Sequence, residues 1–250
     1  MIAILVAVNQ ELNPILRRAD ANQIVRQAHL DFCEGTFAGQ PVALLALGVG
    51  KECARIAAEI TIRCYRPDLI ISAGFGGALQ NSVKHGDLVI GTDVLDLYQD
   101  AGSQVRCRST YPLARHDEIA INGPPLRVHR GKILTTDDMI LRAAIKQHIG
   151  QATGALAVDM ETSAVAAVCA AQHTDLLAVR CITDDADEDL PDDFNDFFVV
   201  GQLRLGRVLS TCNRHPRAVF DLARLGLRAR TAGANLATFL ALALPQLHLA

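Results

Sequence analysis

The chain has 250 residues, of which 50% are hydrophobic and 20% are charged, and its formal net charge is -3. This composition is typical of one sizeable globular domain, and the small net charge provides no field that would attract nucleic acid. Aromatic residues make up 4% of the chain and tryptophan is absent, which argues against stacking platforms for single-stranded nucleic acid. We therefore expect no nucleic-acid partner.

The cysteines and histidines give no sign of a disulfide framework or a metal site. The seven cysteines are scattered, form no CxxC pair and mostly fall in apolar runs, as buried thiols in a reducing cytosol do. The eight histidines are dispersed without an HxH or HxxxH spacing, so the sequence predicts no metal and no cofactor.

Residues 1–8 are apolar but lack a basic start and a cleavage site. They predict a buried first strand and not a signal peptide. No apolar run approaches the ~18–20 residues that are needed to span a bilayer. We therefore expect a cytoplasmic protein.

The first half of the chain alternates between strand and helix patterns. In chain order we predict a strand at 1–8, a helix at 9–18, a hairpin at 30–37 and 41–47, a helix at 51–65, and strands at 69–73 and 88–92. Pro14 falls in the first turns of its helix, where proline is tolerated. Gly48 and Gly50 precede the second helix, and glycine there lets backbone amides face an anion or a close-packed ligand.

The segment 74–79 places Gly74, Gly76 and Gly77 around Phe75. So many glycines indicate that the backbone is approached closely and adopts φ values that a side chain would forbid. A plain turn needs fewer glycines, so we favour a ligand-binding loop over a simple turn.

The second half predicts an irregular, polar surface excursion at 93–125, a strand at 131–136, a helix from Asp137 to about 149, a strand at 154–158, a helix at 163–172 and a strand at 176–183. We expect Asp137 to cap its helix, and the excursion to be a lid or a subunit contact. Strands that alternate with helices after an early hairpin predict an α/β fold with a mixed sheet. With no repeat and no linker, we expect one domain over 1–250.

The last part of the chain, at about 203–250, is basic and apolar and predicts a helical extension. It contains seven arginines against a single acid, Asp221, and an apolar run at 237–244. Two interpretations stay open. The region is either a C-terminal helix that packs on the sheet, or a basic amphipathic surface that contacts anionic lipid.

Three acids, Glu11, Glu161 and Asp184, fall at the ends of predicted strands, where open α/β sheets bind ligands. Simpler interpretations exist, because an acid at a helix start is favoured by the helix dipole. The acidic run 184–196 is also typical of a solvated loop.

If the three acids converge, they suit the cleavage of an N-glycosidic bond. Such a reaction passes through an oxocarbenium-like sugar, and the base leaves well only when a carboxylic acid protonates it. A second carboxylate can activate water, and a third can accept hydrogen bonds from ribose hydroxyls.

Four segments together carry a family resemblance: 7–11 (AVNQE), 74–79 (GFGGAL), 158–161 (VDME) and 180–187 (RCITDDAD). In this order and spacing they resemble the purine nucleoside phosphorylase and nucleosidase superfamily, closest to methylthioadenosine/S-adenosylhomocysteine nucleosidases. The resemblance implies a three-layer αβα fold around a central mixed twisted sheet, and a homodimer or larger oligomer.

The resemblance also implies roles for particular residues. Asp184 would protonate the purine at N7, Glu11 would be the base for water, and Glu161 would hold the ribose hydroxyls. Met139 and Ile140 match the segment that flanks the base, where the family usually has Phe. The expected substrate-binding residues are Gly74, Phe75, Gly76, Met139, Ile140, Asp159, Met160, Glu161 and Thr183.

Two positions depart from the family pattern. Phe75 stands where the family usually has a small hydroxyl residue, and Ser72 stands where the phosphorylase branch has Arg. Phosphate needs fixed positive donors. The absence of this Arg, together with the presence of Glu11 as a base, favours water as the nucleophile.

The Leu190-Pro191 loop and the Arg-rich apolar C-terminal region resemble the hopanoid-associated phosphorylase branch. That resemblance implies release of adenine from adenosylhopane to leave ribosylhopane, with peripheral contact at the inner membrane face. The alternatives are a methylthioadenosine/S-adenosylhomocysteine nucleosidase, a purine nucleoside or futalosine-like phosphorylase, and a non-catalytic nucleoside sensor, against which the three acids argue.

Overall fold

The computed structural model describes residues 1–99, 105–113, 116–117, 119–121, 126–191, 198–199, 202–203 and 216–247. Its helices are α1 (Asn9–Leu16), α2 (Lys51–Tyr65), α3 (Ala143–Thr153), α4 (Thr162–Gln172) and α6 (Pro216–Ala243), with a 3-10 turn at Leu244–Gln246. Its strands are β1 (Ile2–Val6), β2 (Asp20–Gln27), β3 (Leu30–Phe37), β4 (Gln40–Ala46), β5 (Leu69–Ala78), β6 (Leu88–Gln99), β7 (Val105–Pro112), β8 (Val128–Thr135), β9 (Ala155–Asp159), β10 (Asp175–Asp184), β11 (Phe198–Val199) and β12 (Gln202–Leu203).

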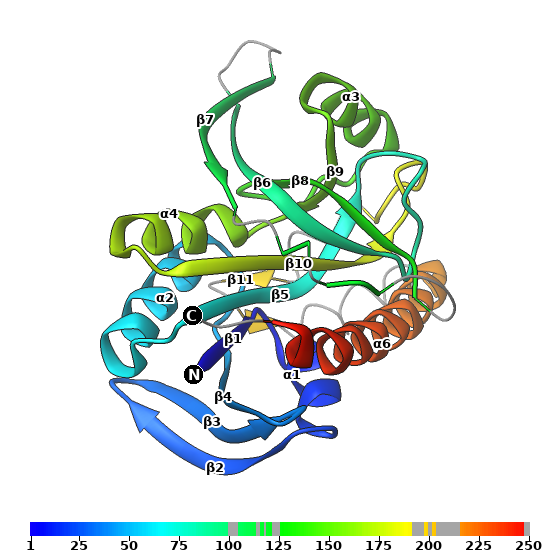
Figure 1. The fold of residues 1–250 in the computed structure, drawn as a ribbon. Coiled ribbons are helices and arrows are strands. Elements are labelled where there is room, and N and C mark those ends of the chain that lie inside the picture. Colours follow the sequence, from blue (N-terminus) through cyan, green and yellow to red (C-terminus); the bar gives the residue numbers. More distant parts are fainter. Residues whose placement is uncertain are drawn as a thin grey trace.

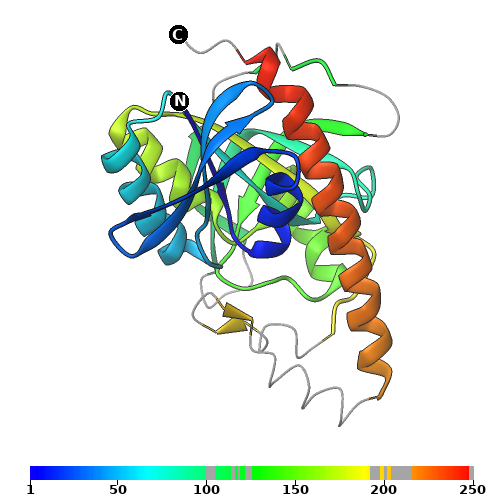
Figure 2. The same cartoon turned by 90° about the horizontal axis from the view of Figure 1, so that it is seen from below.

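The helices cover both faces of a central sheet, as Figures 1 and 2 show. In β1, Ile4 and Val6 pack on the side of α1 and α6, whereas Ala3 and Leu5 pack on the side of α2 and α4. Successive side chains of a strand point to opposite faces, so an entirely apolar β1 is the central strand of a three-layer structure. The predicted αβα fold with a mixed sheet is confirmed.

Within the described residues, ten strands belong to one sheet. β5 pairs in parallel with β1 and β10 and antiparallel with β9. β10 also pairs with β6, β6 with β8, and β8 with β9, so these five strands close into a ring. The parallel pairing of β1, β5 and β10 places their carboxyl ends at the same edge of the sheet.

The glycine segment is not a loop, which corrects the prediction from the sequence. Gly74, Gly76 and Gly77 lie within β5, opposite Arg180, Ile182 and Asp184 of β10 in the strand register. None of the three has a positive φ. These glycines leave room for their neighbours: an added Cβ would meet the side chain of Glu11 at Gly74, the backbone of Val158 at Gly76 and the side chain of Asp184 at Gly77.

The region 93–125 contains more regular structure than the sequence suggested. β6 continues to Gln99, and β7 pairs with it in antiparallel fashion. β7 is largely exposed. Its polar sequence therefore lacks the alternation of apolar and polar residues by which a half-buried strand is predicted. The polar strand β2 was missed for the same reason, since it lies at the edge of the sheet and pairs only with β3.

The prediction that Asp137 caps a helix is wrong. α3 begins at Ala143 after the N-cap residue Arg142, which makes no capping bond through its side chain. Asp137 instead pairs with Lys51 at 2.8 Å, across from the start of α2. The long connection before α3 places Met139 and Ile140 in the lining of a cavity.

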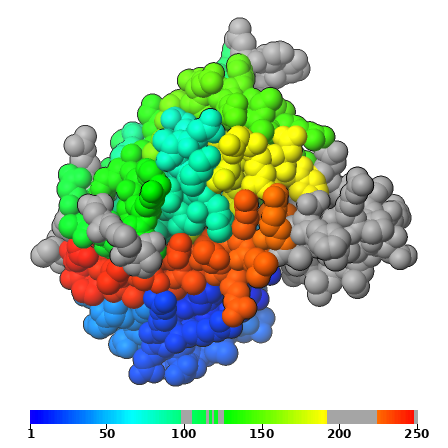
Figure 3. Space-filling view, turned by 90° about the vertical axis from the view of Figure 1, so that its right-hand side faces the viewer, coloured from blue at the N-terminus to red at the C-terminus, as the bar shows by residue number. Residues whose placement is uncertain are grey.

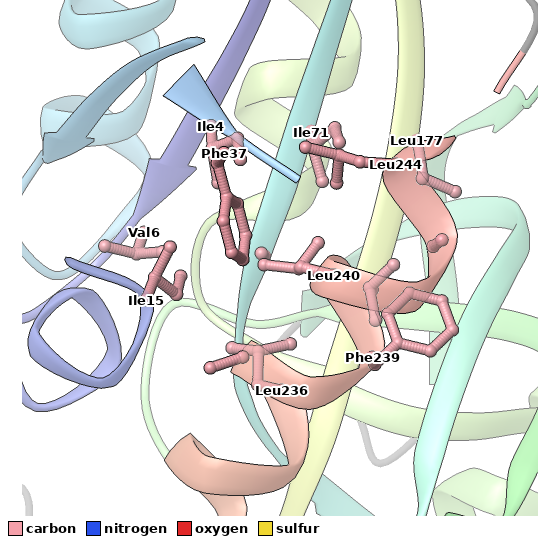
Figure 4. Packing of buried hydrophobic residues seen from close by; sticks show 14 of the residues in the cluster. Ile4, Val6, Ile15, Phe37, Ile71, Leu177, Leu236, Phe239, Leu240 and Leu244 are labelled. Atoms are coloured by element: carbon pink, nitrogen blue, oxygen red, sulfur yellow. The ribbon is translucent and has the colours of Figure 1, made fainter. Parts of the chain in front are cut away.

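The C-terminal helix α6 packs on the sheet. Leu236, Phe239, Leu240 and Leu244 are buried among side chains of β1, α1, β5 and β10 (Figure 4). In the space-filling view, α6 crosses the surface beside the N-terminal residues and the yellow segment that follows β10 (Figure 3). Most of the apolar run 237–244 is therefore core, and this run is not available for contact with lipid.

None of the helices in the described ranges combines the length and apolar composition that crossing a bilayer requires. The cysteines are less uniformly buried than we expected. Among the described ones, Cys169 and Cys181 are buried, but Cys64 and Cys107 are exposed.

Candidate active site

A cavity of about 160 Å³ opens where β1, β5, β9 and β10 end. The acids Glu11, Glu161 and Asp184, which come from three distant parts of the chain, all line it. The full lining is Ala7, Val8, Glu11, Val49, Phe75, Gly76, Gly77, Thr136, Met139, Ile140, Val158, Asp159, Met160, Glu161, Thr183, Asp184 and Leu190. Of the site residues predicted from the sequence, only Gly74 is outside this lining, and it lies directly behind Glu11.

Glu11 lies in the first turn of α1, just after β1, and its side chain is buried. Its Oε2 accepts hydrogen bonds from the amides of Ala7 at 2.7 Å and Val8 at 3.0 Å, and its Oε1 accepts one from Phe75 at 2.6 Å. A carboxylate has about four acceptor positions, so one position on Oε1 stays open. Burial raises the pKa of Glu11, and the three amides oppose this rise.

The position of Glu11 depends on Gly74. A Cβ at Gly74 would lie 2.9 Å from Oε1 of Glu11, which is closer than a carbon and a carboxylate oxygen approach. The carboxylate therefore occupies the space that any larger residue at position 74 would fill.

Asp184 ends β10 and is buried. Its Oδ1 accepts a hydrogen bond from the Thr183 hydroxyl at 3.0 Å, and its Oδ2 accepts one from the ammonium of Lys146. A Cβ at Gly77 would lie 2.8 Å from Oδ2. Burial raises the pKa of Asp184, while the charge and hydrogen bond of Lys146 oppose that rise. A buried carboxyl with a raised pKa is a suitable proton donor near neutral pH.

Glu161 is the N-cap residue of α4, but its carboxylate makes no capping bond to that helix. Its Oε1 instead accepts a hydrogen bond from the amide of Gly50 at 2.8 Å. Burial, together with the nearby charge of Asp159, raises the pKa of Glu161 to about 7. The glycines before α2 thus present an amide to an anion, as predicted, and this anion is a side chain of the protein.

Asp159 and Arg180 form a buried ion pair behind the cavity, with 2.6 Å between Nε and Oδ2. Thr162 donates a hydrogen bond to Asp159 and accepts one from Arg180. Charges at this depth are tolerated only when they are paired and hydrogen-bonded. Within the described residues, no three His, Cys, Asp or Glu side chains gather in a way that could hold a metal ion.

Most of the remaining wall of the cavity is apolar. Val49, Met139, Ile140 and Leu190 line it, and the ring of Phe75 reaches from the cavity to Gly233 of α6, where a Cβ would lie 3.7 Å from the ring. A second cavity of about 380 Å³ shares Thr136, Met139 and Ile140 with the first. Its other lining residues are Leu97, Asp137, Asp138, Leu141, Arg142, Ile145 and Ile149.

A model of the phosphorylase superfamily matches residues 1–214. The chain belongs to this superfamily. Solved structures with the same fold include a 5'-methylthioadenosine/S-adenosylhomocysteine nucleosidase from Neisseria meningitidis in complex with methylthio-immucillin-A, with 22% sequence identity and a TM-score of 0.75 over 98% of this chain and 99% of that chain. A nucleosidase of the same name from S. pneumoniae has 20% identity and a TM-score of 0.75, with 99% of each chain covered.

Another structure similar to this phosphorylase superfamily member is the futalosine hydrolase of Helicobacter pylori strain 26695. Its sequence identity is 18% and its TM-score is 0.75, with 98% of this chain and 97% of that chain covered. At these identities the likeness establishes a shared fold.

Two residues that hold the acids of this superfamily member in place, Lys146 and Arg180, were not predicted from the sequence. Arg180 had a usable signal, because a charged residue within the apolar strand 176–183 must find a buried partner. Lys146 had none, since a lysine on a helix is ordinarily exposed. The role of Gly50 was visible only as a weak glycine pattern before a helix.

Proposed function

We propose that this protein hydrolyses the N-glycosidic bond of a 5'-substituted adenosine and releases adenine. The single observation that carries the proposal is the convergence of Glu11, Glu161 and Asp184 on one cavity. Membership of the phosphorylase superfamily supports it, as does the shared fold with proteins described as nucleosidases and as a futalosine hydrolase.

In the proposed reaction, Asp184 donates its proton to N7 of the purine. The electron pair of the glycosidic bond moves to the base at N9, so that adenine leaves neutral and the sugar becomes oxocarbenium-like. Burial favours the protonated form of Asp184, which gives the reaction its acid.

Glu11 accepts a proton from a water molecule through the open position on Oε1. The oxygen of this water bonds to the anomeric carbon, and free sugar is the second product. The three amides that bind Glu11 hold its carboxylate still, which keeps the base oriented towards the cavity.

Glu161 accepts hydrogen bonds from the ribose hydroxyls, beside Met160. Its Oε1 is held by Gly50, and its Oε2 lies 3.3 Å from the amide of Met160. A carboxylate fixed at both oxygens presents its remaining acceptor positions in a defined direction. Its negative charge also stabilises the positive charge that develops on the sugar.

Water is favoured over phosphate because the only buried guanidinium behind the described site has no free donor. Nε of Arg180 donates to Asp159, Nη1 donates to the carbonyls of Ser72 and Val179, and Nη2 donates to the hydroxyls of Ser72 and Thr162. These bonds use all five N–H groups of an arginine. Phosphate would have to displace one of them.

For the 5' substituent we propose a large apolar group, and specifically the hopane of adenosylhopane. The second cavity borders the first at Met139 and Ile140, and its lining combines apolar residues (Leu97, Ile145, Ile149) with charged ones (Asp137, Asp138, Arg142). The apolar surface that adjoins the nucleoside site supports an apolar substituent. Methylthioadenosine or S-adenosylhomocysteine is the second candidate, supported by the fold shared with nucleosidases of that description.

A lipid-linked substrate also requires access to a membrane, and we assign that contact to the outer face of α6. Leu227 is 67% exposed there, next to Arg224, whose side chain is 55% exposed. Replacement of Leu227 by Asp should reduce binding to anionic vesicles while leaving hydrolysis of a soluble nucleoside unchanged. Equal vesicle binding by both proteins would disprove this assignment.

The deciding experiment is a substrate panel scored for the free base, with and without phosphate. The panel contains adenosylhopane in vesicles, methylthioadenosine, S-adenosylhomocysteine and futalosine. We expect adenine release that is independent of phosphate and yields a reducing sugar. Phosphate dependence with a sugar 1-phosphate product would replace the hydrolase by a phosphorylase, and no release from any compound would overturn the proposal.

A further inference from the structure

The side chain of Lys146 is buried beneath the active site, although it lies on the helix α3. Its side chain is 1% exposed. The ammonium donates to Oδ2 of Asp184 and to the carbonyls of Asp185 at 3.2 Å and Glu188 at 3.0 Å. These three acceptors match the three N–H donors of an ammonium, so this costly burial is fully compensated.

The carbonyls that Lys146 binds belong to the loop 185–190, which forms one wall of the cavity through Leu190. The amide of Leu190 donates to the carbonyl of Leu141 at 2.8 Å, just before α3. Lys146 therefore ties the acid and the wall beside it to the same helix.

The ammonium also decides which oxygen of Asp184 can carry a proton. An ammonium has no acceptor, so a proton on Oδ2 would face only N–H groups. Oδ1 accepts one hydrogen bond, from the hydroxyl of Thr183, and its other lone-pair position can carry the proton that passes to the purine. The oxygen that is suited to carry a proton is therefore Oδ1.

We propose that Lys146 is a positioning residue for the acid: it binds Oδ2 of Asp184, directs the transferable proton to Oδ1, and fixes the loop 185–190 beside the leaving base. This inference rests on the proposed function of Asp184. The contacts of Lys146 with Asp184 and with the carbonyls of Asp185 and Glu188 support this role.

Other charged groups around Asp184 are already paired. Glu188 pairs with Arg224 and Arg228 of α6, and Asp185 accepts a hydrogen bond from the amide of His85 at 2.7 Å. Arg228 also reaches the carbonyl of Thr183 at 3.5 Å. Lys146 is thus the cation in direct contact with the acid among the described residues.

This arrangement has a signature in the pH dependence of the reaction. The charge of Lys146 lowers the pKa of Asp184 against the effect of burial, so its removal raises that pKa. Because the reaction needs protonated Asp184, the alkaline limb of kcat/KM then moves to higher pH. Glu161 and Glu11 also titrate in the cavity, but their contributions are common to both proteins and cancel in the comparison.

The test compares wild-type protein with Lys146→Met and Lys146→Arg, using the preferred soluble nucleoside of the panel from pH 5 to 10. Lys146→Met should lower kcat about tenfold or more, with a smaller change in KM, and move the alkaline limb upward by about one pH unit. Lys146→Arg should keep the limb of the wild type. Lys132→Met is the matched control, since Lys132 also contacts α3, at the carbonyl of Thr153, but from the surface.

If Lys146→Met does not fold, Lys146→Gln replaces it, because an amide still donates to the loop carbonyls without the charge. A folded variant with an unmoved limb would overturn the proposal, even if kcat fell, because a purely structural tie has no effect on titration. An inactive wild-type protein would instead reject the proposed function, so the two failures are distinguishable.

Discussion

Glu161 and Gly50 are 111 positions apart in the chain, and the amide of Gly50 donates to Oε1 of Glu161 at 2.8 Å. Gly50 has φ 97° and ψ 160°, a conformation that is essentially restricted to glycine. The carboxylate proposed to hold the ribose is therefore oriented by a backbone group that only a glycine can present in this way.

Replacement of Gly50 by Ala should cost stability and weaken substrate binding. A Cβ there meets nothing within 4 Å, so the penalty is purely conformational and amounts to about 1–3 kcal/mol. As the amide moves away from Glu161, the carboxylate loses one hydrogen bond. KM should then rise roughly tenfold, which corresponds to the loss of one hydrogen bond to a charged group. Gly39→Ala is the control, because Gly39 also has a positive φ and free space but lies in the turn before β4. It should lose stability at unchanged KM.

The raised pKa of Glu161, about 7 against an ordinary 4.5, predicts a pH-dependent stability. An acid whose pKa is higher in the folded state contributes its stability fully below pH 4.5 and loses it as the pH rises through 7. Glu161→Gln should therefore gain stability relative to the wild type between pH 5 and 8, by about 3 kcal/mol at most. Urea unfolding of both proteins at pH 5 and at pH 8 measures this gain. A difference in the free energy of unfolding that is the same at both pH values would contradict the prediction.

Replacement of Asp184 by Asn should abolish adenine release while substrate still binds. The amide has nearly the same shape but cannot supply a proton, so kcat should fall by about 10²–10⁴-fold. Single-turnover adenine release and calorimetric binding measure the two effects separately. Turnover at the wild-type rate would show that another group is the acid.

Replacement of Gly74 by Ala should impair the base more than the fold. The new Cβ would lie 2.9 Å from Oε1 of Glu11, so the carboxylate must rotate away from the amide of Phe75. We expect kcat to fall about tenfold or more. Gly226→Ala in α6 meets nothing within 4 Å and should gain about 1 kcal/mol of stability with normal kcat. A normal rate for Gly74→Ala would remove Glu11 from the mechanism.

Replacement of Leu240 by Ala tests whether α6 belongs to the core. Leu240 is fully buried against β1, β5 and β10, and the cavity left behind should cost about 2–5 kcal/mol. The exposed Leu242, at 48%, is the control, and its change to Ala should cost far less. Chemical denaturation provides both values. Equal values would mean that α6 is only loosely attached.

The alternation of elements and the apolar β1 were readable in the sequence because a strand that is buried on both faces must be apolar throughout. The same reasoning placed Glu11 and Asp184 at strand ends. It failed for β2, β7 and the glycine segment, where pairing with a neighbouring strand determines the structure and the side chains follow no burial pattern.

The sequence by itself determined the α/β class, through the alternation of its elements, and the superfamily, through the resemblance carried by four short segments. Only the tertiary structure decided that Lys146 reaches Asp184, that Gly50 orients Glu161 and that α6 is core. These contacts join residues far apart in the chain. They depend on how the helices dock onto the sheet, which no local pattern of residues encodes.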